Sequence, residues 1–351
     1  MAVYTTIDDS EAYFQTVLYT GDGSADNAIT LPGDTDMQPD FVWIKNRDAT
    51  DNHCLFDAVR GATKVLHCNV TDAESTDADT LDSFTSDGFQ VDADVKVNTN
   101  TEKYAAWNWK AGTTSGIVTN ASTDITPSAY SFNQTAGFSV FKFTGAGNSG
   151  DTVAHGLGAV PEFIIVKVIG TTHGWITYHG ALGGTRNFNL ETSNAPATAI
   201  SRWNNTNPDS VNITLGNSNN VNGASTDYIC YAFSGKQGYS KFGEYTGNGN
   251  ADGTFVNTGF RPAWVMIKQY NDAGSWNIFD NKRQGYNVEN DLFLADGTNV
   301  EADVTVIDLL SNGFKMRDTD DDRNGSGDTY VYVAFAEAPF VNSNGVPNNA
   351  R

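Results

Sequence analysis

The densest group of side chains that could bind a metal ion lies near the end of the sequence. Asp318, Asp320 and Asp322 alternate along one short stretch, which is the oxygen spacing that wraps Ca²⁺ in EF-type loops. However, Arg323 stands where such a loop needs glycine, and no glutamate closes the loop. Two interpretations stay open: a hairpin tip that binds Ca²⁺ weakly, and a solvated acidic turn. The missing residues favour the acidic turn, and we expect no other cofactor.

A polar, loop-like stretch in the middle of the chain offers a candidate ligand contact. It contains Arg202, Trp203 and Asn204. Sugar rings stack on flat apolar surfaces beside polar groups, and tryptophan combines a large apolar ring with a polar N–H group. The three residues therefore predict a contact with a glycan. The alternative is that Trp203 packs as a lid over the edge of a β-sandwich.

Catalytic chemistry is not expected. No nucleophile elbow surrounds a serine, and no Cys/His spacing suits zinc. An aspartate is followed three residues later by an arginine at two places, as Asp57 with Arg60 and as Asp280 with Arg283. These residues could form a binding dyad on a loop, but surface ion pairs of this kind contribute about 0–1 kcal/mol and need no functional explanation. We favour local ion pairs and predict that the protein is not an enzyme.

Asp57 and Asp280 belong to a pattern that occurs three times in the chain. Its positions are counted from Pro39, Pro161 and Pro262. The spacing is identical in all copies, and tandem copies of one unit indicate an architecture built by duplication. The shared positions are an aromatic residue at +2 (Phe41, Phe163, Trp264), a lysine at +6 (Lys45, Lys167, Lys268), His53, Trp175 and Trp276 at +14, Phe56, Tyr178 and Phe279 at +17, and Asp57, His179 and Asp280 at +18.

The elements that carry these residues are predicted to be strands. Runs of β-branched and aromatic residues are bounded by Pro and turn residues, and helical periodicity is nearly absent. Repeats of about 100 residues match the size of one domain. The sequence therefore predicts an all-β chain of three tandem β-sandwich domains of the jelly-roll or Greek-key type. The predicted boundaries are 1–112, a linker at 113–136, 137–237, 238–340 and a tail at 341–351.

The predicted central strands are apolar at consecutive positions. Neighbouring residues of a strand point to opposite faces, so both faces must be covered. A loop, the next repeat or another subunit could cover the second face. We predict subunit contacts through Phe41, Trp43, Trp264 and Met266, and hence a homo-oligomer, with a trimer favoured.

Composition narrows the partners and the compartment. The formal net charge is −21, which disfavours nucleic acids and anionic membrane surfaces. No apolar span approaches transmembrane length, and the N-terminus lacks the features of a secretion signal, so we expect cytoplasmic synthesis without membrane insertion. The three cysteines lack a disulfide framework spacing and are expected to be free, buried thiols.

The C-terminal sequence from Ala334 to Arg351, which contains FAEAPFVNSNGVPNNAR, resembles the ending of a group of proteins encoded by marine tailed bacteriophages. The resemblance continues through residues 41–47, 59–61, 106–112 and 238–242, and so covers nearly the whole chain. It implies a virion structural protein, assembled in the host cytoplasm with other virion proteins. We expect a tail fibre or tail appendage that contacts the host surface, where glycans are candidate ligands. The alternatives are a capsid decoration or head fibre and, less favoured, a polysaccharide depolymerase.

Overall fold

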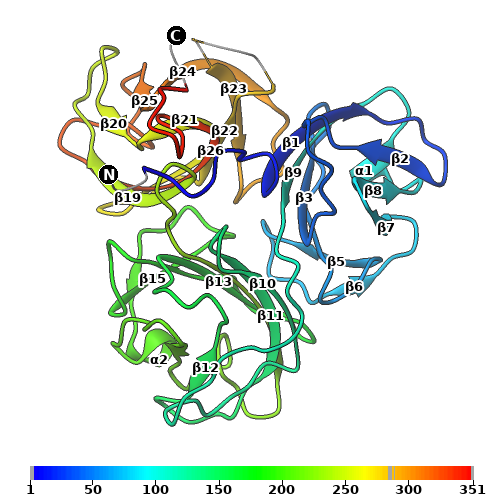
Figure 1. The fold of residues 1–351 in the computed structure, drawn as a ribbon, viewed down its shortest axis with the longest axis vertical. Helices are drawn as coiled ribbons and strands as arrows, with labels where there is room; N and C mark the ends of the chain where they lie inside the picture. The colour runs from blue at the N-terminus through cyan, green and yellow to red at the C-terminus, as the bar shows by residue number, and fades with distance from the viewer. Residues whose placement is uncertain (1–3, 284–286, 288, 349–351) are drawn as a thin grey trace.

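Three antiparallel sheets with one shared strand order form the body of the protein (Figure 1). The computed structural model describes residues 4–283, 287 and 289–348. In each unit, an entry strand pairs with the strand that closes the unit, which pairs with the strand that carries the +2 aromatic residue. The sheets contain the matching orders β1-β9-β3-β4-β5, β11-β18-β13-β14-β15 and β19-β26-β21-β22-β23. The all-β, multi-sandwich prediction is confirmed.

The first unit has nine strands and one short helix among the described residues. A second, smaller sheet of order β2-β8-β7 faces the main sheet across the unit's own core. The elements are β1 (Phe14–Thr20), β2 (Asn27–Thr30), β3 (Phe41–Asn46), β4 (Cys54–Asp57), β5 (Lys64–His67), β6 (Ser75–Thr76), β7 (Leu81–Thr85), β8 (Gly88–Val91), α1 (Val95–Asn98) and β9 (Lys103–Trp109).

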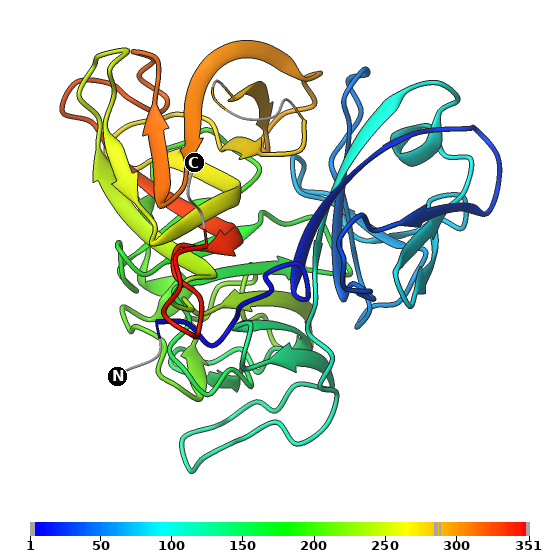
Figure 2. The same cartoon turned by 45° about the horizontal axis from the view of Figure 1, so that its top comes forward.

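The second unit repeats this plan and adds an edge strand, β10, which lies inside the segment predicted to be a linker. Figure 2 shows the segment before β10 running out along the second unit and returning. The elements are β10 (Ala129–Asn133), β11 (Phe138–Thr144), β12 (Thr152–Ala154), β13 (Phe163–Val168), β14 (Ile176–His179), β15 (Arg186–Asn189), β16 (Ala197–Thr198), α2 (Ile200–Trp203), β17 (Asn212–Thr214) and β18 (Asp227–Phe233).

In the third unit the main sheet continues from β23 into β24, β25 and β20. These strands correspond to β7, β8 and β2, which form the separate smaller sheet of the first unit. Its elements are β19 (Ser240–Thr246), β20 (Phe255–Asn257), β21 (Phe260–Gln269), β22 (Asn277–Asp280), β23 (Glu289–Leu294), β24 (Ala302–Leu310), β25 (Gly313–Met316) and β26 (Thr329–Pro339). None of the helices in the described part of the chain has the length and hydropathy needed to cross a bilayer.

The doubly apolar strands have one face in their own unit and one face at the centre of the molecule. In β3, Val42 and Ile44 belong to the core of the first unit, whereas Phe41 and Trp43 belong to a large central core. The central core also receives Trp264 and Met266, and the three units surround it as three lobes (Figure 1). The next repeat therefore covers the second face. The prediction that these four residues form a subunit interface is wrong, because each is at most 2% exposed within one chain.

The two ends of the described chain help to close the ring of units. The Tyr4 hydroxyl donates to the carbonyl of Gly259 in the third unit (2.7 Å). The Ser343 amide, in the predicted tail, donates to an oxygen of Asp8 (2.6 Å). The N-terminal segment therefore contacts both the third unit and the C-terminal segment.

Candidate functional site

The tryptophans at the +14 position connect each unit to the preceding one. Trp175 Nε1 of the second unit donates to the His67 carbonyl of the first unit (3.0 Å). Trp276 Nε1 of the third unit donates to the Asn189 carbonyl of the second unit (3.1 Å). Both indole rings are fully buried. The +14 position of these two units therefore serves packing between units.

His53 makes the corresponding contact from the first unit to the third. Trp43 Nε1 donates to His53 Nδ1 (2.9 Å), so the proton lies on Nε2, which donates to the Leu294 carbonyl (3.1 Å). Burial lowers the pKa of His53 well below its usual value, and the ring stays neutral. The three +14 contacts therefore form a closed cycle.

The residues at +18 form a second cycle. Asp57 of the first unit binds Arg60 Nε (2.5 Å) and accepts from the Tyr231 hydroxyl of the second unit (2.7 Å). Burial of the aspartate and the arginine is nearly complete, with 0% and 2% of their side chains exposed. The predicted local ion pair is therefore present, but it does not lie at the surface, because the side chains are enclosed between two units.

Asp280 repeats this arrangement between the third and first units. Its Oδ2 accepts from Arg283 Nε (2.6 Å) and from Trp107 Nε1 of the first unit (3.1 Å). His179 occupies the +18 position of the second unit, where Nε2 donates to the carbonyl of Tyr332 in the third unit (3.1 Å). Each pair of units is thus joined by one +18 contact.

The three +6 lysines are fully buried beside neighbouring units. Desolvation lowers the pKa of each lysine to about 8, and hydrogen bonds to carbonyl oxygens hold the ammonium groups. The cross-unit partners are the Thr71 carbonyl for Lys167 (3.3 Å), the Ser193 carbonyl for Lys268 (2.8 Å) and the Phe293 ring for Lys45 (5.5 Å to the centroid). The polar residues at +6, +14 and +18 therefore join units.

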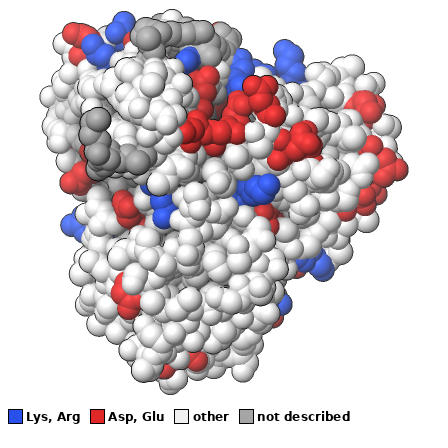
Figure 3. Space-filling model, viewed as in Figure 1, with Lys and Arg blue, Asp and Glu red and all other residues white. Residues whose placement is uncertain are grey.

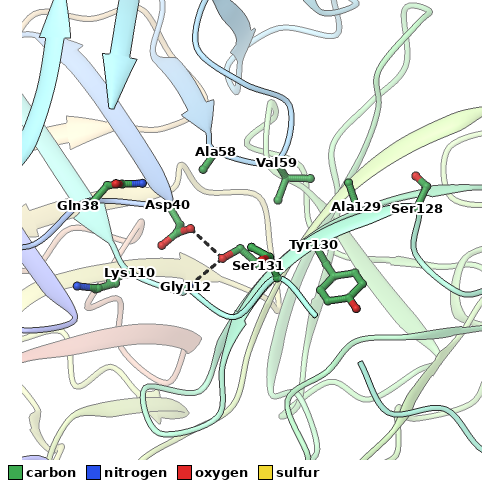
Figure 4. Close-up of a pocket in the computed structure, with 11 residues that line it drawn as sticks. Gln38, Asp40, Ala58, Val59, Lys110, Gly112, Ser128, Ala129, Tyr130 and Ser131 are labelled. Carbon is green, nitrogen blue, oxygen red and sulfur yellow. Dashed lines mark hydrogen bonds between the residues drawn. The ribbon is translucent and has the colours of Figure 1, made fainter. Parts of the chain in front are cut away.

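The candidate site is a cavity of about 680 Å³ between the first and second units (Figure 4). This volume lies within the range of about 300–1,000 Å³ found for small-molecule sites. The first unit contributes residues beside β3, β4 and β9, and the second unit contributes β10. The lining residues are Gln38, Asp40, Ala58, Val59, Lys110, Gly112, Thr114, Ser128, Ala129, Tyr130 and Ser131.

Asp40 is the buried carboxylate of this cavity. Its oxygens accept hydrogen bonds from Ser131 Oγ (2.8 Å) and from the Ala111 amide (2.8 Å), and Ser131 in turn accepts from the Gly112 amide (2.8 Å). Figure 4 shows Asp40 pointing toward Ser131 across the junction of the units. Burial raises the pKa of Asp40, and the two hydrogen bonds oppose that increase.

The other two unit junctions also contain cavities, but these are smaller. Glu162 lines one of about 350 Å³ between the second and third units, where its carboxylate accepts from the Gly235 amide (3.0 Å). The junction between the third and first units has about 10 Å³, and Ala263 takes the place of the acid there. The first junction therefore offers the most room.

The sequence contained one signal for this site. Asp40 and Glu162 both directly follow the repeated prolines Pro39 and Pro161, whereas Ala263 follows Pro262. An acid at +1 in two copies could have singled out these junctions. Nothing in the sequence indicates that β10 would meet Asp40, because that contact joins segments far apart in the chain.

The structure does not present Arg202, Trp203 and Asn204 as a ligand surface. Trp203 ends α2 with 1% of its surface exposed, and its ring packs edge-on against Tyr178 at 5.9 Å. Arg202 donates to Ser218 Oγ, and Asn204 accepts from Ser149 Oγ (2.9 Å). The prediction that Trp203 offers a stacking surface for a glycan is therefore wrong, because the ring lies inside the second unit. This burial agrees with the alternative, in which Trp203 packs as a lid.

Asp318, Asp320 and Asp322 do not converge on one point. Arg323 Nε donates to Asp318 (2.7 Å) and Arg323 Nη2 donates to Asp320 (3.2 Å). Within the described residues, no group of three acidic, histidine or cysteine side chains is arranged to hold a metal ion. The arginine that interrupts the loop motif thus pairs with two of the predicted ligands.

Comparison with protein families matches residues 9–339 to a family described as Domain of unknown function (DUF7483). No curated protein and no solved structure matches the chain.

Proposed function

We propose, on the premise that the chain belongs to this family of unknown function, that it is a structural protein of a tailed-bacteriophage virion. It would lie on the outside of the particle, as a tail fibre or tail appendage, and contact the host surface. The observation that carries this proposal is the use of the repeated residues. The polar side chains that recur at +6, +14 and +18 form contacts between units, and the hydrogen bond from Trp107 to Asp280 is one example.

The burial of the repeated polar side chains between units supports a role in assembly and attachment. Neutral, buried histidines such as His53 and His179 are held by carbonyl groups and are not open to a substrate. Acidic side chains gather on one face, where the first and third units meet (Figure 3). Such a surface disfavours nucleic acid. The resemblance of the C-terminal sequence to marine phage proteins supplies the virion context.

A homotrimer of this chain is part of the proposal, but the four residues first expected at its interface are internal. Copies of the chain would therefore meet through other residues. The chain already contains three units around one centre (Figure 1).

The test is the position of the chain in the assembled particle. Antibodies against the purified chain, labelled with gold, should bind at the tail in electron micrographs of the phage. Labelling over the capsid would replace the attachment role with shell decoration. Labelling absent from intact particles and from disrupted particles would overturn the virion assignment.

A further inference from the structure

The cavity between the first and second units has the chemistry of a sugar site. One wall carries polar groups: the Asp40 carboxylate, the Lys110 ammonium and the Gln38 amide. The opposite wall carries apolar side chains from Val59 and Ala129. Figure 4 shows Gln38, Asp40 and Lys110 on one side and Ala129 on the other, where Ser128 and Tyr130 also lie. A pyranose ring has the same division, with hydroxyls at its rim and C–H groups on its face.

Asp40 retains acceptor capacity for a ligand. A carboxylate offers about four lone-pair sites, and each oxygen of Asp40 accepts one hydrogen bond within the protein. Those bonds come from Ser131 and Ala111 and fix the orientation of the carboxylate. A positioned carboxylate of this kind can accept bonds from adjacent hydroxyls of a sugar.

The wall from the second unit is also held in place. The Tyr130 hydroxyl accepts a hydrogen bond from the Ile117 amide (3.2 Å), and the Tyr130 ring lies 5.9 Å from that of Phe132. Tyr130 is half-buried and offers part of its ring as apolar surface. A preformed site loses less entropy when a ligand binds.

The charge of the chain limits which sugars suit the cavity. The net charge is −21, and a buried carboxylate lies within the site. Both oppose the binding of uronic or sialic acids. We propose that this cavity binds a neutral hexose unit of a glycan, with Asp40 as the hydroxyl acceptor. The inference deepens the proposed attachment function and rests on it only for the source of the glycan.

The experiment is saturation-transfer NMR on the purified full chain with the methyl glycosides of glucose, galactose and mannose as probes, followed by titration of any that bind. We expect at least one to bind. Asp40→Asn should weaken it by about tenfold or more, since a charged acceptor becomes a neutral one. Ala129→Leu should also weaken binding, because its larger side chain narrows the cavity without removing a hydrogen bond.

Glu162→Gln is the matched control, since it makes the same change at the second junction and should leave the affinity unchanged. Thermal melting of each variant separates loss of binding from loss of folding. The inference is overturned if none of the three glycosides binds, if binding survives both cavity variants, or if glucuronic acid binds more tightly than the neutral sugars. Because these measurements use the free chain, they are independent of its position in the particle.

Discussion

Trp107 Nε1 of the first unit lies 3.1 Å from Asp280 Oδ2 of the third unit, and this hydrogen bond closes the ring of repeats. The same carboxylate accepts from Arg283 Nε at 2.6 Å. Its two partners come from different units, so Asp280 couples the local structure of one repeat to the position of another.

Replacing Asp280 by alanine should therefore be strongly destabilising. The change removes the carboxylate that binds Arg283 Nε and leaves the buried guanidinium with Glu301 as its remaining acidic partner (3.2 Å). Breaking a buried pair of this kind costs about 3–5 kcal/mol. Urea unfolding of the variant measures the loss. Asp227→Ala is the control, because Asp227 pairs with Lys142 at the surface, where about 0–1 kcal/mol is expected. Equal losses for the two variants would contradict the structural role of Asp280.

The central core predicts that the three units unfold together. Phe41, Phe163 and Trp264 from the three units belong to one continuous cluster, so loss of one unit exposes apolar faces of the other two. Calorimetry should show one transition, with a van't Hoff enthalpy close to the calorimetric enthalpy. Three separate transitions would show that the units are independent domains.

Acid should destabilise the protein through its buried histidines. The pKa of His179 is lowered to about 4 by burial, whereas an unfolded histidine has a pKa of about 6.5. Between these values the unfolded state binds more protons, so the free energy of unfolding falls as the pH decreases from about 6.5 to about 4. The loss from about pH 7 to about pH 5 is about 2 kcal/mol for this residue. Urea unfolding at both pH values checks it, and His179→Gln should reduce the pH dependence.

Trp203 should matter for stability. It is buried against Tyr178 in the second unit, and truncation of a buried tryptophan to alanine costs about 3–5 kcal/mol. Chemical denaturation of Trp203→Ala measures this cost. Ile200→Ala, on the exposed side of the same helix, should change stability by about 0.5 kcal/mol or less. An unchanged stability for Trp203→Ala, together with lost binding of particles to host cells, would restore the predicted glycan contact.

Ca²⁺ should leave the melting temperature of the protein unchanged. Arg323 already pairs with Asp318 and Asp320, and a ligand stabilises only in proportion to its binding to the folded state. Differential scanning fluorimetry with and without millimolar Ca²⁺ tests this. A rise in melting temperature that disappears in Asp320→Asn would establish the weak site that the spacing alone suggested.

The fixed spacing from each proline determined much of the architecture. Strand propensity predicted strands at the repeated positions in every copy, and these strands pair as β3–β4, β13–β14 and β21–β22. The period of two along a strand also required that both faces of β3 be covered. These features follow from local physics: propensity, turn residues and alternation operate within a few residues of the chain.

Only the tertiary structure decided what covers the second face. A sequence cannot distinguish a neighbouring repeat from a second subunit, because both present the same apolar surface. For the same reason the sequence did not predict that Asp57 and Arg60 are buried, because Tyr231 from another unit contacts them. The sequence also did not predict the cavity at Asp40, because the walls of this cavity belong to segments that meet only when the units pack. Local pattern determined the strands, and long-range packing determined which residues are interior and which are open to a ligand.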